Sequence, residues 1–293
     1  MATTNASAPK GAPKKQSAGF TGIKSGLSVI IVCAVIAVCI YLFGFGSISN
    51  FKGAENATAG FSFLCGADEN YEPANLMGTV YKGGFVVPII WTLLITVVAL
   101  AIERFFAIRN AYGRTSLTKF VAEIKVALKQ NDMAKAQQLC DKQQGSVANV
   151  VGASIAAYNE MEHTPNLKRA QKVAKIQQAH EEATQLEMPT LQMNMPILAT
   201  IVTLGTLTAL FGTVVGMIRS FAALASGGGG DSLQLSEGIS EALVNTASGI
   251  LTSWFAVVSY NYYSNKIDKL TYALDEVGYT IAQTYEANHG DEA

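Results

Sequence analysis

Four blocks of apolar residues, separated by polar segments, dominate the pattern of this chain. Each block is long enough to cross about 30 Å of hydrocarbon as an α-helix that rises about 1.5 Å per residue. The pattern therefore predicts an all-α membrane protein with four transmembrane helices. We expect these helices at residues 27–45, 83–102, 188–225 and 237–265.

The third and fourth apolar blocks have polar helical continuations. We therefore expect the third and fourth helices to extend into a cytoplasmic helical domain. Pro189 and Pro196 predict kinks where the third helix enters the membrane, because proline disrupts helical hydrogen bonding.

The basic residues beside the apolar blocks predict the orientation, because positive side chains stay on the cytoplasmic side. Lysines precede the first block without any acidic residue, and Arg104, Arg109 and Arg114 follow the second. Both termini should therefore be cytoplasmic. A cleaved signal peptide is the alternative for the first block, but its apolar run is long for that role. The expected connecting segments are a disordered basic cytoplasmic tail at 1–26, a periplasmic loop at 46–82, the cytoplasmic helical domain at 103–187, a periplasmic turn at 226–236 and a cytoplasmic tail at 266–293.

The expected cytoplasmic domain contains three helix starts. Ser116 and Asp132 are each suited to cap a helix whose apolar residues fall on one face. Asn166, which follows Pro165, predicts the start of a third helix that continues into the third span.

Composition agrees with a membrane protein, since 49% of the 293 residues are hydrophobic and 15% are charged. The net charge of −1 says little about partners, and the sequence contains no nucleic-acid-binding footprint. Cys33, Cys39, Cys65 and Cys140 have no disulfide or metal-ligand spacing, so we expect no cofactor.

Polar residues are interspersed within the third and fourth apolar blocks, which makes these two blocks unlike the first two. The third block carries Thr206 and Thr213 among several glycines. In the fourth block a polar stripe recurs at helical spacing, and it consists of Glu241, Asn245, Ser248 and Thr252. Polar side chains in hydrocarbon usually face water, another helix or a transported ion. The pattern favours a shared conduit, and the alternative is that the hydroxyls bond to carbonyls of their own helices.

Glu241 and Arg219 are the two charges close to this stripe. Counted from the turn between the last two spans, the two residues lie at similar depth and could form an ion pair. In the simpler alternative, Arg219 extends to the lipid headgroups and Glu241 stabilises the first turns of its own helix.

The runs LFGTVVGMIRSF at 210–221 and LSEGISEALVNTASGI at 235–250 resemble the paired pore helices of the MotA/TolQ/ExbB proton channel family, most closely its ExbB members. The resemblance implies that Thr213 and Thr246 line a pore and that Glu241 is the carboxylate of the same element. It further implies a homopentamer in the bacterial inner membrane that conducts protons. The implied partners are an ExbD-like single-span protein, which carries the titrating aspartate, and a TonB-like protein that drives outer-membrane transport.

The chain departs from this family pattern in two places. Trp254, Phe255 and Ala256 stand where the family usually has Ile-Pro-Ala, which predicts a straighter fourth helix. The first apolar block is an additional span, because ExbB-like proteins typically have three.

Other classes remain open from the sequence. They are a TolQ-like or gliding-type stator and a structural membrane-assembly protein without proton conduction. A solute transporter is a third class, but it would normally show internal repeats, and the first two apolar blocks do not resemble the last two. An enzyme is disfavoured because the run Gly227–Gly230 lacks the Lys-Ser/Thr of a phosphate-binding loop.

Overall fold

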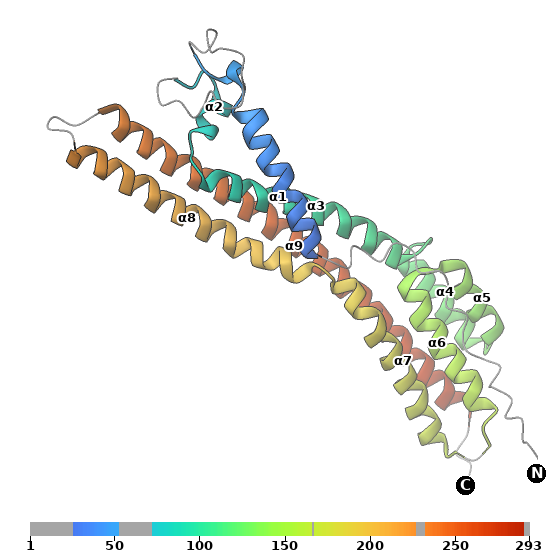
Figure 1. Cartoon of the computed structure of the whole chain (residues 1–293). Helices are drawn as coiled ribbons and strands as arrows, with labels where there is room; N and C mark the ends of the chain where they lie inside the picture. Colours follow the sequence, from blue (N-terminus) through green and yellow to red (C-terminus); the bar gives the residue numbers. More distant parts are fainter. Residues whose placement is uncertain (1–25, 53–71, 166, 227–231, 290–293) are drawn as a thin grey trace, which may run out of the picture. The chain divides into compact units, whose positions relative to one another are not determined.

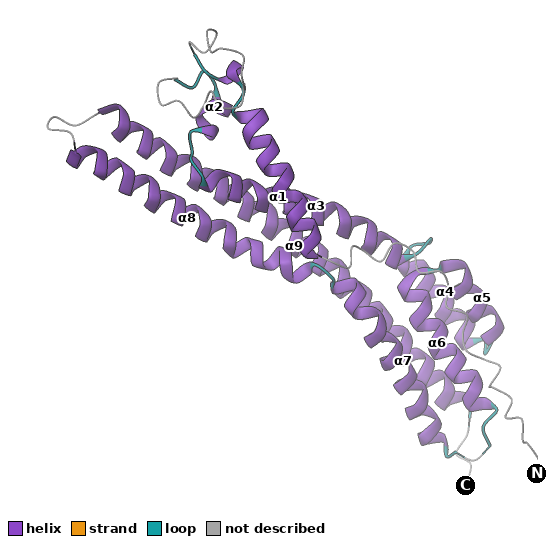
Figure 2. Ribbon diagram, viewed as in Figure 1, coloured by secondary structure: helices purple, strands orange, loops and turns teal. Residues whose placement is uncertain are grey.

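A computed structural model describes residues 26–52, 72–165, 167–226 and 232–289. These residues form helices and connecting loops, with no β-strand among them and one isolated antiparallel bridge between Phe51 and Pro73 (Figure 2). Four of the helices are long and apolar enough to cross a membrane, which confirms the predicted all-α membrane fold. The predictions for the N-terminal tail, Cys65, Asn166 and Gly227–Gly230 lie outside the described residues.

The chain divides into two compact units, and each is described by itself. The first, here called the membrane unit, comprises residues 23–104 and 194–264. The second, here called the polar unit, includes residues 105–193 and 265–293.

The membrane unit contains all four apolar helices in part or in full (Figure 1). Its elements in chain order are α1 (Gly26–Cys39), a π-helical continuation (Ile40–Phe45), a 3₁₀ turn (Ile48–Asn50), α2 (Leu76–Tyr81), most of α3 (Val86–Tyr112), α8 (Met195–Ser226) and the first part of α9 (Ser232–Asn288). The buried positions of α1 are Cys33 and Ala37, one helical turn apart, and much of the remaining surface of α1 is exposed and apolar. That exposed surface suits contact with lipid.

Glycines bring the backbones of α8 and α9 together. An ideal Cβ on Gly249 would lie 2.6 Å from the carbonyl oxygen of Gly205, and closer still to Ala209 Cβ. A Cβ on Gly216 would lie 2.7 Å from the carbonyl oxygen of Gly238. Small residues at these crossings are therefore required by space, as in many membrane helix pairs.

The polar unit is a set of helices around its own core. Its elements are α4 (Leu117–Lys129), α5 (Met133–Gln143), α6 (Gly145–Glu162), α7 (Arg169–Gln192) and the last part of α9. Ser116 caps α4 by accepting from Lys119 N, and Asp132 caps α5 by accepting from Lys135 N, so both predicted caps are confirmed. The helix α6 was not predicted, although its buried residues recur at helical spacing.

The predicted helix that leads into the third span is interrupted by a short break. The helix α7 ends at Gln192, and α8 begins at Met195 after a break in which Asn194 adopts a left-handed backbone with φ of 63°. Pro196 therefore lies in the first turn of α8, where a missing N–H costs no intrahelical hydrogen bond. Pro189 lies inside α7.

Candidate functional site

Glu241 of α9 forms an ion pair with Arg219 of α8 near α2. Arg219 Nη1 donates to Glu241 Oε2 across 2.8 Å. The two side chains differ in burial, since Glu241 is 5% exposed and Arg219 is 56% exposed. The second carboxylate oxygen, Oε1, is buried and has no hydrogen-bond partner among the described residues. The site thus contains a nearly enclosed carboxylate, Glu241, whose charge is neutralised by a more exposed arginine.

The turn between α2 and α3 supports this carboxylate. Lys82 Nζ donates to Glu237 Oε1 across 2.8 Å, and Asn245 Nδ2 donates to the carbonyl oxygen of Gly83 across 3.1 Å. Between them, Gly84 lies against Glu241, because an ideal Cβ there would be 2.8 Å from Glu241 Cδ. The three α9 residues are spaced four apart, so the turn follows one face of α9 over two helical turns.

Gly84 is required at this place for two reasons. Its φ is +78°, which side-chain-bearing residues rarely adopt, and a Cβ would collide with the Glu241 carboxylate. This contact was not predicted from the sequence. The adjacent glycines at 83 and 84, directly before an apolar helix, were the available signal.

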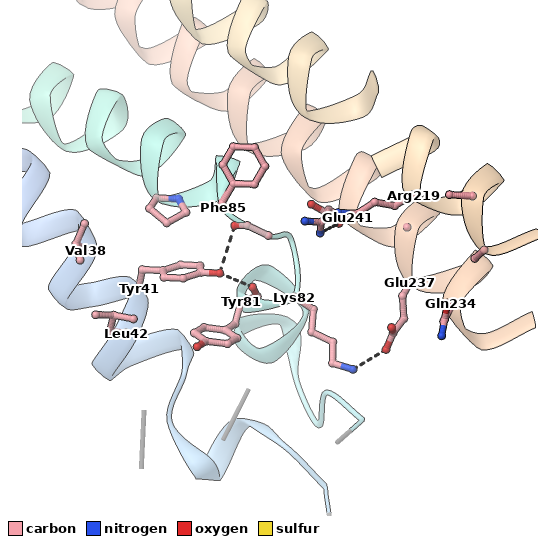
Figure 3. A pocket seen from close by; sticks show the side chains of 15 residues that line it. Val38, Tyr41, Leu42, Tyr81, Lys82, Phe85, Arg219, Gln234, Glu237 and Glu241 are labelled. Carbon is pink, nitrogen blue, oxygen red and sulfur yellow. Dashed lines mark hydrogen bonds and ion pairs between the residues drawn. The ribbon is translucent and has the colours of Figure 1, made fainter. Parts of the chain in front are cut away.

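A groove of about 1040 Å³ opens over these groups (Figure 3). Its lining combines α1, the turn before α3, and the facing ends of α8 and α9. Figure 3 shows the hydroxyl of Tyr41 pointing at the turn and the Lys82–Glu237 pair on the rim. The groove is therefore lined by an exposed cation, Arg219, and by apolar side chains such as Val38 of α1 and Leu42 of its π-helical continuation.

The predicted pore hydroxyls bond to their own helices. Thr206 Oγ1 donates to the carbonyl oxygen of Thr203 across 2.9 Å, Thr213 Oγ1 to that of Leu210 across 2.6 Å, and Thr246 Oγ1 to that of Ala242 across 2.9 Å. A hydroxyl that donates in this way still has lone pairs that can accept from water. Thr206 is exposed, and Thr213 and Thr246 are partly exposed, so this chain leaves all three accessible.

The predicted polar stripe on α9 is mostly interior. Asn245 and Thr252 are fully buried and therefore contact other parts of the same chain, while Ser248 is partly buried. Thr252 Oγ1 donates to the carbonyl oxygen of Ser248 across 2.9 Å. Asn245 Oδ1 has no partner among the described residues. The pore-lining role of these residues stays a prediction.

A second buried ion pair lies at the other end of α3's apolar segment. Arg104 is completely buried and donates from Nε to Glu103 Oε2 across 2.6 Å. Asn194, in the break before α8, donates from Nδ2 to the same oxygen across 3.4 Å. From the sequence, Arg104 indicates only the orientation of the span, because a linear pattern does not reveal which residues cover a side chain.

Comparison with known proteins bears on α6 to α9. Residues 148–276 match the model of the MotA/TolQ/ExbB proton channel family. The chain is similar to this family over these residues, which make up somewhat less than half of its length. Thr213, Glu241 and Thr246 all lie within the matched residues, whereas α1 and the turn at Lys82–Gly84 precede them.

Individual relatives are of two kinds. The chain is 29% identical over 190 residues to a biopolymer transport protein, ExbB-like 1, of Synechocystis, covering 63% of this chain and 69% of the relative. It is 28% identical over 143 residues to the Tol-Pal system protein TolQ of Pseudomonas aeruginosa, covering 48% and 59%. With TolQ of Haemophilus influenzae it shares 38% over 85 residues, 29% of this chain and 37% of the relative. The chain is thus a multi-pass membrane protein that is similar to ExbB-like and TolQ proteins.

Proposed function

We propose that this chain is a member of the MotA/TolQ/ExbB family and a proton-channel stator subunit of a bacterial inner membrane, with both termini in the cytoplasm. In this role it couples the proton motive force, together with an ExbD-like single-span partner, to a TonB-like protein and TonB-dependent transport across the outer membrane. The family-model match and the ExbB-like relative support the proposal. Several copies of the chain, five by analogy with the family, would surround the partner helices.

The observation that carries the proposal is the unequal burial of polar groups on α8 and α9. The chain encloses Asn245 and Thr252 but leaves Thr213 and Thr246 partly exposed. Exposed hydroxyls on membrane helices are favourable when they face water or another subunit rather than lipid tails. In the proposed assembly, the Thr213 and Thr246 hydroxyls line a hydrated path, and the proton-binding carboxylate at its centre belongs to the partner.

A flux measurement tests this role. The chain and its partner are reconstituted into liposomes, and proton entry under an imposed potential is followed with a trapped pH dye. Replacing Thr213 and Thr246 together by valine keeps their shape but removes both hydroxyls, and we expect partner-dependent flux to be lost. The control is Thr280→Val, which removes a hydroxyl with the same own-helix hydrogen bond in the polar unit. Unchanged flux in the double variant would refute the lining role.

A TolQ-like stator role is the second candidate, because two of the relatives are named TolQ. Purifying the tagged chain in mild detergent and identifying its stoichiometric partners by mass spectrometry separates the two. A TonB-like protein among them supports the first role, and Tol-system proteins support the second. A well-assembled complex that conducts no protons would favour a purely structural protein.

A further inference from the structure

The helix α1 and the turn that it contacts precede the residues that match the family, so their role has to be argued from this chain alone. One face of α1 and its continuation points into the membrane unit at intervals of four residues. That face consists of Cys33, Ala37, Tyr41 and Phe45. The ring of Tyr41 stacks on Tyr81 with centroids 4.7 Å apart, and Phe45 meets Trp91 edge-on at 4.7 Å.

The hydroxyl of Tyr41 is directed at the turn that supports Glu241. It donates to the carbonyl oxygen of Tyr81 across 2.8 Å and lies 3.3 Å from that of Gly84. Tyr81 is the last residue of α2, so its carbonyl has no partner within the helix. In a medium with little water such a carbonyl is costly when unpaired, and Tyr41 satisfies it.

The turn therefore has contacts on two sides. On one side Tyr41 bonds to Tyr81 and Gly84, and on the other Gly84 packs against the buried carboxylate of Glu241. A displacement of Gly84 away from α9 would open space beside Glu241 Oε1, which is now enclosed and unpaired. The position of α1 and the environment of Glu241 are thereby linked through the backbone of Gly84.

The start of α1 is also fixed. An ideal Cβ on Gly26 would lie 3.0 Å from Asn194 Oδ1, and closer still to Ile197 Cδ1 at the beginning of α8. Asn194 in turn contacts the buried Glu103. With close contacts at both ends, α1 is held along its axis and can act as a strut rather than as a loosely attached anchor.

We propose that α1 is a strut for the Glu241 site and that Tyr41 is its positioning residue. Through the Tyr81–Gly84 turn, the Tyr41 hydroxyl keeps the Glu241 carboxylate enclosed and directed at Arg219. An effect of Tyr41 on proton flux rests on the proposed function, whereas its effect on the enclosure of the Glu241 carboxylate does not.

The test measures the accessibility of Glu241 directly. Tyr41→Phe removes the hydroxyl but keeps the ring that stacks on Tyr81. The full chain in lipid nanodiscs is treated with a hydrophobic carbodiimide, which reacts with protonated carboxyl groups, and modification of Glu241 is followed by peptide mass spectrometry. We expect modification about fivefold faster in Tyr41→Phe, the factor that corresponds to one lost hydrogen bond. Tyr272→Phe is the control, because Tyr272 is 75% exposed in the polar unit.

A second variant covers the case in which Tyr41→Phe does not assemble. Lys82→Met removes the Lys82–Glu237 pair and so releases the same turn from its rim side. We expect faster modification of Glu241 here too. An unchanged rate in a folded Tyr41→Phe protein, or in Lys82→Met where Tyr41→Phe fails to fold, would overturn the inference.

Proton flux with the partner gives the functional readout. Tyr41→Phe should shift the dependence of flux on outside pH, while Tyr272→Phe should leave it unchanged. Faster modification without a flux shift would retain Tyr41 as a positioning residue and show that the environment of Glu241 does not limit flux. If the wild-type complex conducts nothing, the proposed function fails and the modification rates still decide the positioning role.

Discussion

The ion pair of Glu241 and Arg219 should be strongly asymmetric towards substitution. The carboxylate is 5% exposed and the guanidinium is 56% exposed. Removing Arg219 leaves a buried carboxylate without the ion-pair partner that it has among the described residues, and such a change typically costs about 3–5 kcal/mol. Removing the charge of Glu241 instead leaves an arginine that can already reach water or headgroups, and we expect a cost of about 0–1 kcal/mol.

Reversible unfolding in mixed micelles with increasing dodecyl sulfate would measure both values. Both tryptophans, Trp91 and Trp254, lie in the membrane unit, so their fluorescence reports on the unit that contains the pair. The variants are Arg219→Leu and Glu241→Gln, with Arg109→Leu as a control for loss of an exposed arginine. Equal costs, or a larger cost for Glu241→Gln, would refute the reasoning, because burial would then not determine which partner depends on the other.

Three further predictions follow from other parts of the structure. Arg104→Leu should destabilise the membrane unit by about 3–5 kcal/mol, because it removes the guanidinium that neutralises the buried carboxylate of Glu103. Combining Glu103→Gln with Arg104→Leu should recover most of that loss in the same unfolding assay, and a double variant as unstable as the single one would contradict this. Gly249→Ala should lower the free energy of unfolding by about 1–3 kcal/mol, because it forces α8 and α9 apart. The control is Gly152→Ala, whose Cβ would meet nothing closer than 3.9 Å and which should be neutral or slightly stabilising. Equal effects of the two substitutions would argue against tight packing of the helix pair. Burial lowers the pKa of His180 below its usual 6.5, although Asp275 and Glu181 oppose this, and its Nε2 has no partner among the described residues. As pH falls through about 6.5, the unfolded chain therefore takes up a proton on His180 before the folded chain does. The polar unit should therefore lose stability as pH falls from about 7.5 to about 5.5, and hydrogen exchange of the amides of α6 and α7 measures this loss. His180→Gln should flatten the pH dependence.

The apolar pattern was sufficient to predict four membrane helices, because the thickness of hydrocarbon sets a minimum length that few other segments reach. Local signals were also sufficient for the caps at Ser116 and Asp132, since a capping side chain bonds to backbone only three residues away. Both kinds of prediction depend on interactions within one helix or with the surrounding solvent.

The neighbours of each helix could not be predicted in the same way. Periodicity placed Glu241, Asn245 and Thr252 on one face of α9, but it could not show that the face lies inside the chain. The burial of Arg104 and the approach of Gly84 to Glu241 depend on segments far apart in sequence. A kink was predicted at Pro196, whereas the helix breaks just before it, because Pro196 suits the beginning of a helix as well as a kink within one.

The groove near α2 combines residues of two different kinds. Arg219, Glu237 and Glu241 lie within the residues that match the family, whereas Tyr41 and Lys82 precede them. The family-model match therefore bears on α8 and α9, where hydroxyls and the carboxylate are found. The turn and α1, which hold that carboxylate in place, precede the matched residues. A comparison of the chain with and without the Tyr41 contact thus tests the part of the site that lies outside the match.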